Sequence, residues 1–129
     1  MANKIQIQHP DVQEGFKTGA YSPAIICEGW LYVSGQTAVD YVNGVYRLGT
    51  IEEETHWTMQ NVGRLLEAAG CSWDDVVKTT VHLADIADFA AYNSVYATYF
   101  PGIKPARTTV QSGLRNGIKI EIDVVAKVP

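Results

Sequence analysis

Residues Pro105–Val124 read PARTTVQSGLRNGIKIEIDV, and this stretch decides the fold of the 129-residue chain. Apolar and polar residues alternate on both sides of the polar run 113–117, which begins and ends with glycine. Such a pattern is typical of two antiparallel strands joined in a hairpin. Matching the apolar faces of the two strands places Arg107, Thr109 and Glu121 on the same side. Arg107 and Glu121 are therefore predicted to be cross-strand neighbours roughly 5–8 Å apart, which makes them a candidate site for a small acid.

The rest of the chain predicts two helices and several more strands. Thr50 and Glu53 form a capping box that begins the first helix, and Gly70 ends it. A second helix is expected over residues 86–100, where a Pro-Gly pair stops it. Further strands are expected at residues 4–8, 24–27, 30–34, 45–47 and 76–83. This order of elements predicts a single α+β domain over residues 1–129, with both helices on one face of a mixed sheet.

Two helices can cover only one face of such a sheet. The uncovered face is expected to carry polar and apolar side chains together, namely Arg107, Thr109, Gln111, Glu121 and Val125. A structured face that is this partly apolar predicts that the protein associates with itself.

Composition and charge exclude several classes of function. The net charge is −4 and no run of Lys or Arg occurs. Because nucleic-acid binding depends on neutralising phosphates with basic residues, we expect no nucleic-acid partner. No apolar stretch approaches the roughly 18 residues of a membrane span, and the N-terminus lacks the apolar core of a signal peptide. We therefore expect a cytoplasmic protein with no membrane partner.

The cysteines and histidines predict neither a disulfide framework nor a metal site. Cys27 and Cys71 stand alone in the sequence, which fits a reducing compartment. His9, His56 and His82 do not show the spacing of metal ligands. We expect no bound metal.

Seven short motifs, each weak alone, occur along nearly the whole chain. They are Gly19-Ala20-Tyr21-Ser22-Pro23-Ala24, Tyr32-Val33-Ser34-Gly35-Gln36, Ala68-Ala69-Gly70-Cys71, Val77-Lys78-Thr79-Thr80-Val81, Asn93-Ser94-Val95-Tyr96 before Tyr99-Phe100, Pro105-Ala106-Arg107, and Ile120-Glu121-Ile122. In this order and at nearly this spacing, they resemble the motifs of the RidA (YjgF) family of reactive intermediate and imine deaminases.

The resemblance implies a fold, an assembly and an activity. The fold would be the chorismate-mutase-like α+β fold. The assembly would be a homotrimer whose sheets form a central β-barrel, with ligand clefts between subunits. The activity would be hydrolysis of short-lived enamines and imines, such as 2-aminoacrylate, to 2-oxo acids and ammonia. The family's chemistry needs no metal or organic cofactor.

The resemblance also assigns residues to the cleft. Arg107 matches the arginine that grips the substrate carboxylate, and Glu121 matches the glutamate that holds the reacting water. The positions that match other residues lining the cleft are Tyr21, Ser34, Gly35, Asn93 and Thr109. Many members have cysteine at the position of Thr109, and many have proline at the position of Ala20. These departures concern the choice of substrate more than the fold.

Arg107 and Glu121 are chemically suited to these two roles. Arg107 can hold a carboxylate through a bidentate, charge-assisted pair. Glu121 can accept a proton from water and return it to the leaving ammonia. A binding module that holds a small carboxylate without turnover remains an alternative, and an endoribonuclease is a weaker one because of the acidic balance. The substrate itself also stays open between 2-aminoacrylate and a dedicated pathway enamine, such as an aminomuconate-like acid.

Overall fold

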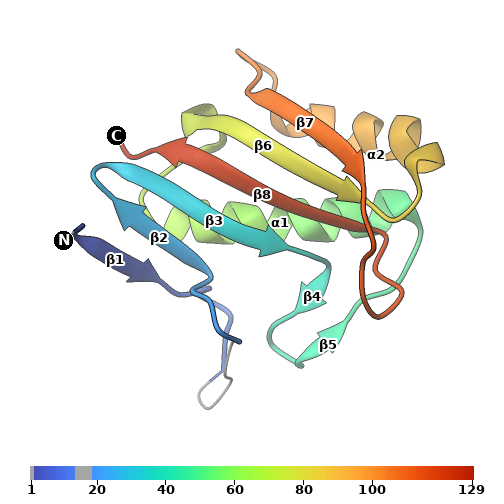
Figure 1. Ribbon diagram of the computed structural model, residues 1–129, viewed down its shortest axis with the longest axis horizontal. Helices are drawn as coiled ribbons and strands as arrows, with labels where there is room; N and C mark the ends of the chain where they lie inside the picture. The colour runs from blue at the N-terminus through green and yellow to red at the C-terminus, as the bar shows by residue number, and fades with distance from the viewer. Residues whose placement is uncertain (1, 14–18) are drawn as a thin grey trace.

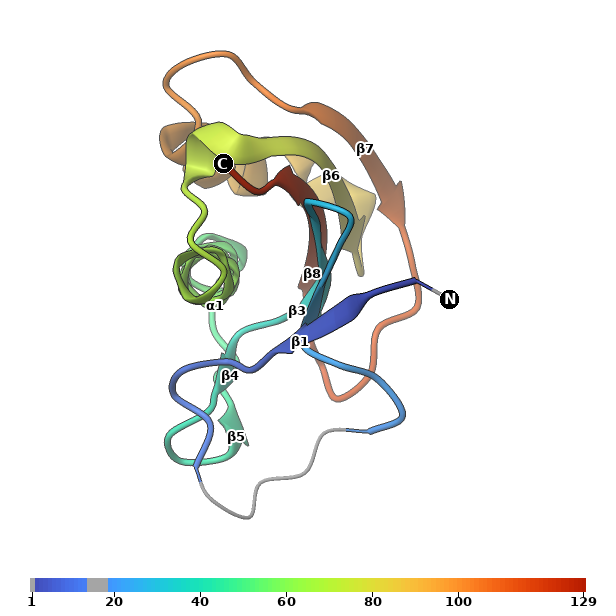
Figure 2. The same cartoon turned by 90° about the vertical axis from the view of Figure 1, so that its left-hand side faces the viewer.

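A six-stranded mixed sheet forms the body of the domain, and both helices pack on the same face of it (Figure 1, Figure 2). The computed structural model describes residues 2–13 and 19–129. The sheet order is β1-β2-β3-β8-β6-β7, and a separate two-stranded sheet holds β4 and β5. The elements are β1 (Lys4–Ile7), β2 (Ala24–Cys27), β3 (Trp30–Gln36), β4 (Val39–Asp40), β5 (Val45–Tyr46), α1 (Ile51–Ala68), β6 (Val76–Leu83), α2 (Phe89–Tyr96), β7 (Ala106–Gln111) and β8 (Ile120–Lys127). The expected α+β architecture is confirmed.

Helix α1 begins at the capping box that the sequence predicts. The backbone N–H of Glu53 donates to Thr50 Oγ1 (3.1 Å), and the backbone N–H of Thr50 donates to Glu53 Oε1 (3.0 Å). Just past the other end, Gly70 takes a φ of +77°, a conformation that glycine adopts without strain. The local signals in the sequence therefore set both ends of this helix.

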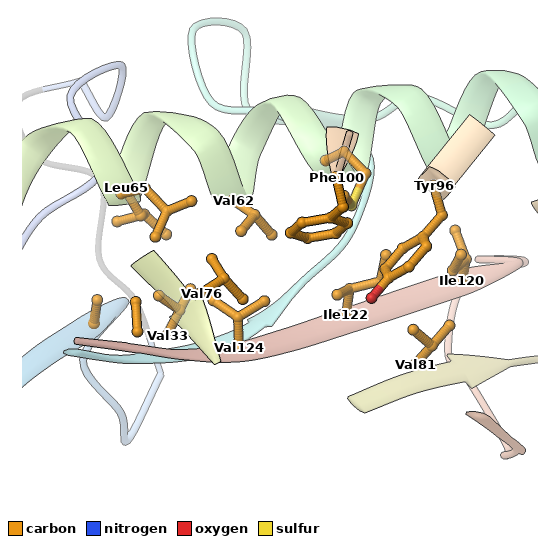
Figure 3. Close-up of a cluster of buried hydrophobic side chains, with 14 of the residues drawn as sticks. Val33, Val62, Leu65, Val76, Val81, Tyr96, Phe100, Ile120, Ile122 and Val124 are labelled. Carbon is orange, nitrogen blue, oxygen red and sulfur yellow. The ribbon is translucent and has the colours of Figure 1, made fainter. Parts of the chain in front are cut away.

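The hydrophobic core lies between α1 and the middle of the sheet (Figure 3). Alternate residues of β8, namely Ile120, Ile122 and Val124, are each at most 2% exposed. Val62 and Leu65 of α1 face this row of side chains (Figure 3). Full burial of one such side chain stabilises a fold by roughly 1.5–3 kcal/mol, so the row anchors β8 firmly under α1.

None of the helices in the described part of the chain is long and apolar enough to cross a membrane.

The second helical stretch has the expected extent but is not one α-helix. Residues Ile86–Asp88 and Ala97–Tyr99 form 3₁₀ turns on either side of α2. The first turn is capped by Asp85, whose Oδ1 accepts from the backbone N–H of Ala87 (2.9 Å). Tight turns of this kind are common at helix ends. They leave α2 short, so it covers only the part of the sheet near β6 and β7.

The predicted hairpin between β7 and β8 is wrong. Strand β7 pairs in parallel with β6, where Arg107 lies opposite Thr79. Strand β6 pairs antiparallel with β8, where His82 lies opposite Glu121. Strand β6 therefore lies between the two strands of the predicted hairpin (Figure 1). Alternation tells which residues share a face, but it does not tell which strand is the neighbour. The strand–helix–strand order of β6, α2 and β7 makes a parallel crossover instead.

Arg107, Thr109 and Gln111 lie on the helix-covered face, although the sequence analysis places them on the uncovered one. The Arg107 guanidinium lies over aromatic rings of α2. Thr109 Oγ1 and Tyr92 Oη are 2.7 Å apart, and the backbone N–H of Ile86 donates to Gln111 Oε1 (2.9 Å). The physical reason is that tyrosine hydroxyls and backbone groups around α2 satisfy these polar side chains, so an edge strand can turn its polar side toward the helix.

Glu121 lies on the opposite, uncovered face of the sheet. Its neighbours Ile120 and Ile122 both point into the core, so the alternation along β8 turns Glu121 away from it. The predicted direct pairing of Arg107 with Glu121 in one chain is therefore wrong. The uncovered face still exposes apolar surface, since Tyr32 is 50% exposed and Val110 is 39% exposed. Self-association through this face stays a prediction.

Glu54 connects the start of α1 with the loop that leads into β8. This side chain is fully buried, and its Oε2 accepts from the Gly49 backbone N–H (3.1 Å) and from Lys119 Nζ (3.1 Å). Its Oε1 accepts from the backbone N–H of Lys119 (3.0 Å). Glu54 therefore holds the chain two residues before Glu121.

Glu54→Ala is expected to destabilise the fold by about 2–4 kcal/mol, because it leaves two backbone N–H groups and one ammonium without their acceptor. Urea unfolding of the variant and of the wild type measures the difference. Glu52→Ala, on the exposed side of the same helical turn, is the matched control and should cost much less. Equal costs at the two positions would contradict the anchoring role of Glu54.

Candidate active site

Strand β7 and helix α2 present Arg107 beside an open cavity, and we call this group the arginine half-site. Its side chains are Asn93, Tyr96, Phe100, Lys104 and Arg107, and they line a cavity of about 360 Å³. Arg107 Nη1 donates to Asn93 Oδ1 at 2.6 Å. This bond fixes the guanidinium against the helix while most of its N–H donors stay unused.

Aromatic rings orient the same guanidinium. Its central carbon lies 5.0 Å from the ring centroid of Tyr96, 5.4 Å from that of Phe89 and 5.7 Å from that of Tyr92. Within the described residues Arg107 forms no salt bridge. The charge is thus held in place without being neutralised, as an anion-binding arginine requires.

Tyr92 and Tyr96 keep their hydroxyl groups in hydrogen bonds with the sheet. Tyr96 Oη lies 2.7 Å from Thr79 Oγ1, in the same way that Tyr92 pairs with Thr109. Burial raises the pKa of Tyr96, while the bond to Thr79 and the charge of Arg107 offset part of that rise. Both rings therefore act as a rigid support for Arg107, and Thr109 contributes by fixing one of them.

Glu121 lines a second cavity, which we call the glutamate pocket. Its volume is about 280 Å³, and its walls come from β3, the β4–β5 sheet, and the loop between β7 and β8. The lining residues are Tyr21, Gly35, Thr37, Val39, Tyr41, Gly44, Val45, Tyr46, Leu114, Arg115, Ile118 and Glu121. The Glu121 side chain is half-buried and makes no hydrogen bond or ion pair with the described residues. Its carboxylate is thus available to a water molecule or a ligand.

Tyr41 lines the glutamate pocket, and Ser34 supports the segment next to it. Ser34 Oγ donates to the carbonyl of Ser22 (2.6 Å), which fixes the segment next to Tyr21. Tyr41 Oη donates to Gln36 Oε1 (3.0 Å). Burial, with smaller contributions from Tyr21 and Tyr46, raises the pKa of Tyr41 to about 12. Tyr41 therefore keeps its proton at neutral pH and serves as a donor.

Gly35 allows the backbone of β3 to approach the Glu121 carboxylate. A Cβ at this position would lie 2.8 Å from Glu121 Cδ and 2.9 Å from Oε2. The atoms that would have to move belong to the flexible end of a side chain, so the fold can tolerate the change. The Glu121 carboxylate, however, would be displaced by the added methyl group.

Gly35→Ala is therefore expected to lower kcat about 10- to 100-fold with little loss of thermal stability, because it displaces the reactive group and not the core. Steady-state kinetics and a melting curve check the two parts. Gly113→Ala is the matched control, since a Cβ there meets nothing within 4 Å. A fully active Gly35→Ala enzyme would contradict the placement of Glu121.

The structure brings the predicted residues together in two groups. Asn93, Arg107 and, through Tyr92, Thr109 belong to the arginine half-site, whereas Tyr21, Gly35 and Glu121 line the glutamate pocket and Ser34 supports it. The two groups lie on opposite faces of the sheet in one chain. Within one chain these seven residues therefore do not form a single site.

The supporting aromatic residues and Arg115 are not among the site residues that the motifs predict. Phe89, Tyr92 and Tyr96 recur at helical spacing next to Asn93, and this pattern is a usable signal for an aromatic face. Arg115 carries no such signal, because tertiary contacts alone bring its loop to the pocket. Among the described residues, no group of three or more His, Cys, Asp or Glu side chains is arranged to hold a metal ion.

Comparison with known proteins agrees with the sequence motifs. The family model described as Endoribonuclease L-PSP matches residues 13–128. The chain is 46% identical over 109 residues to the 2-iminobutanoate/2-iminopropanoate deaminase of Rattus norvegicus, covering 84% of this chain and 80% of that one. A putative endoribonuclease L-PSP from Entamoeba histolytica has a crystal structure with a TM-score of 0.89 and 41% identity, covering 98% of this chain and 100% of that one. RidA from an Antarctic Psychrobacter gives a TM-score of 0.87 at 32% identity, covering 96% and 99%. The chain therefore belongs to the Endoribonuclease L-PSP family, which is the RidA (YjgF) family indicated by its motifs.

Proposed function

We propose that this protein is a deaminase that hydrolyses small 2-imino and 2-enamino acids to 2-oxo acids and ammonia. The observation that carries the proposal is the pair of complementary groups, an un-neutralised Arg107 and an unpaired Glu121, each beside a cavity. The name of the rat relative, 46% identical to this chain, supports this assignment.

The complete site forms between neighbouring subunits of a homotrimer. Arg107 lies on β7, which is an edge strand of the sheet, so a second chain can approach it. Glu121 lies on the uncovered face, which exposes apolar surface that a second chain can bury. A neighbour that packs its uncovered face near the β7 edge places its Glu121 pocket opposite Arg107. Three such contacts close the sheets around a central β-barrel.

Catalysis at this composite site depends on positioning the substrate and the water more than on activating them. Arg107 of one subunit holds the substrate carboxylate, and Glu121 of the neighbour holds a water beside the imine carbon. The water oxygen bonds to that carbon, its proton passes to Glu121, and the C=N electron pair becomes a lone pair on the nitrogen. Glu121 then returns the proton to this nitrogen, which gives a neutral carbinolamine. Glu121 next takes the hydroxyl proton and delivers it to the amine, so the C–N bond breaks with release of NH3 as C=O forms.

No metal or organic cofactor is needed for these steps, because the imine carbon is already electrophilic. An enamine such as 2-aminoacrylate enters the same sequence after a proton from solvent adds to its terminal carbon and the nitrogen loses one. The pathway conserves all atoms of imine and water in the 2-oxo acid and ammonia.

The deciding experiment generates 2-aminoacrylate from serine with a serine dehydratase and follows the release of pyruvate with and without this protein. The expected result is faster release than in buffer, in proportion to the protein added. No acceleration together with measurable pyruvate binding would instead identify a carboxylate-binding module without turnover. Size-exclusion chromatography with light scattering tests the trimer.

RNA cleavage is the weaker alternative, and the family description is the observation that favours it. A net charge of −4 opposes it, because RNA binding requires cationic surface. RNA cleavage that survives Arg107→Ala in extensively purified protein would show a separate nuclease site.

We further propose a cytoplasmic location, where amino-acid-metabolising enzymes release such imines.

A further inference from the structure

The glutamate pocket contains a cation that the proposed reaction does not use. Among the described residues that line this cavity, Arg115 is the one basic residue and Glu121 is the one acidic residue. The Arg115 guanidinium makes no ion pair or hydrogen bond with any residue of the described chain. Its charge is therefore not neutralised within one subunit.

The backbone turn that carries Arg115 is fixed, so the base of this exposed side chain has a set position beside the pocket. The backbone N–H of Ile118 donates to the carbonyl of Arg115 (3.1 Å), and Asn116 and Gly117 both have positive φ angles of 61° and 74°. Two central residues of this kind define a type I′ turn. Ile118 is 8% exposed, and the adjoining Lys119 is bound to buried Glu54.

The cavity is larger than a three-carbon imino acid requires. Such a substrate has few non-hydrogen atoms, and even at the roughly 30 Å³ that a water occupies in the liquid, six atoms fill about 180 Å³. The cavity of one subunit alone has about 280 Å³. Arg115 and Glu121 line the same cavity, so a substrate with a longer side chain has room to extend from Glu121 toward this arginine.

We propose that Arg115 binds a second carboxylate, so that the preferred substrates are imines or enamines of dicarboxylic 2-oxo acids. This inference rests on the proposed function, in which Arg107 of a neighbouring subunit already holds the carboxylate next to the imine. Arg115 then pairs with the carboxylate at the far end of the substrate, while Glu121 manages the water between them. Unpaired arginine is suited to this task because its planar fork binds carboxylates in a bidentate manner.

The competing occupant of the excess space is an apolar side chain, since Val39, Val45 and Leu114 also line the pocket. A charged arginine without a partner disfavours that occupant, because an apolar ligand would cover the charge and provide no hydrogen-bond acceptor. The test below includes a substrate of this kind.

The test compares three freshly generated imines in a competition with semicarbazide, which traps whatever imine the enzyme leaves. D-Amino-acid oxidase makes 2-iminopropanoate from D-alanine and the corresponding imine from D-leucine, and D-aspartate oxidase makes 2-iminosuccinate. The proteins are the wild type, Arg115→Gln, Arg115→Lys, and Arg64→Gln as a control that removes one arginine charge far from the pocket.

We expect Arg115→Gln to lower the ratio of kcat/KM for 2-iminosuccinate over that for 2-iminopropanoate about 10- to 100-fold, mainly through KM. Arg115→Lys should restore part of the ratio because it keeps the charge, and Arg64→Gln should leave the ratio unchanged. Oxaloacetate should bind more weakly to Arg115→Gln than to the wild type, with a smaller change for pyruvate.

Several outcomes overturn the inference while the proposed function stands. They are hydrolysis of 2-iminopropanoate but not of 2-iminosuccinate, a preference for the leucine imine, or an unchanged ratio in Arg115→Gln. An equal loss for both substrates would also overturn it, because Arg115 would then hold the carboxylate that all substrates share. Hydrolysis of none of the three imines by the wild type would instead overturn the proposed function itself, and the inference with it.

Discussion

Glu121→Gln is expected to lower kcat/KM for 2-iminopropanoate by about 10²- to 10⁴-fold, the range that general acid–base catalysis usually contributes. Glutamine has the same shape and can still hydrogen-bond a water, but it cannot accept and return a proton. The loss should therefore lie mainly in kcat, with a smaller effect on KM. Competition with semicarbazide measures both constants.

The matched control for this variant is Asp123→Asn. Asp123 lies two residues further along β8 on the same uncovered face, and it faces His82 at 3.6 Å instead of lining the glutamate pocket. The Asp123→Asn substitution removes a carboxylate from the same strand but outside the pocket, so this variant should retain most of the activity. A Glu121→Gln enzyme as active as Asp123→Asn would show that the pocket carboxylate is not the base.

Local sequence signals predict the elements of this fold well. The capping box at Thr50, the terminating Gly70 and the alternation of β8 each depend on contacts between residues close in the chain. Such contacts can be recognised in a short window of sequence. For this reason both helical stretches and the expected strands occur where the patterns place them.

The neighbours of a strand depend on contacts far apart in the chain, and here the alternating pattern alone is misleading. Two alternating runs with a glycine-bounded loop between them favour a hairpin, yet β6 occupies the place between β7 and β8. The competing signal is present, since a strand, more than ten helical residues and another strand are typical of a parallel crossover. Once that crossover forms, the loop at residues 112–119 has to pass the end of β6.

The same distinction explains what could be predicted of the candidate site. Motifs indicate the residue types, because Arg107, Asn93 and Glu121 each stand in a recognisable short segment. They do not indicate that the arginine and the glutamate lie on opposite faces of one sheet. The separation of the two groups is the reason for the proposal that a second chain completes the site.

Arg107→Ala is expected to lower kcat/KM about 10²- to 10³-fold, because the substrate carboxylate loses its bidentate partner and its position relative to the water. The exposed guanidinium contributes only modestly to folding through its aromatic contacts, so the variant should keep its melting temperature. Arg64→Gln, which removes an arginine from the outer side of α1, serves as the control and should remain active.

A mixture of Arg107→Ala and Glu121→Gln chains tests whether the two groups act across a subunit boundary. In a shared site, one subunit supplies Arg107 and its neighbour supplies Glu121. After joint refolding in equal amounts, half of the chains carry an intact Arg107 and the other half carry an intact Glu121. A given site between two subunits therefore holds both groups in about a quarter of cases, so about a quarter of the wild-type activity should return although both parents are nearly inactive. A site within one chain gives no recovery, because every chain in the mixture lacks one of the two groups. Recovery that follows the product of the fractions of the two chain types, when the mixing ratio is varied, would therefore assign the carboxylate clamp and the base to different subunits.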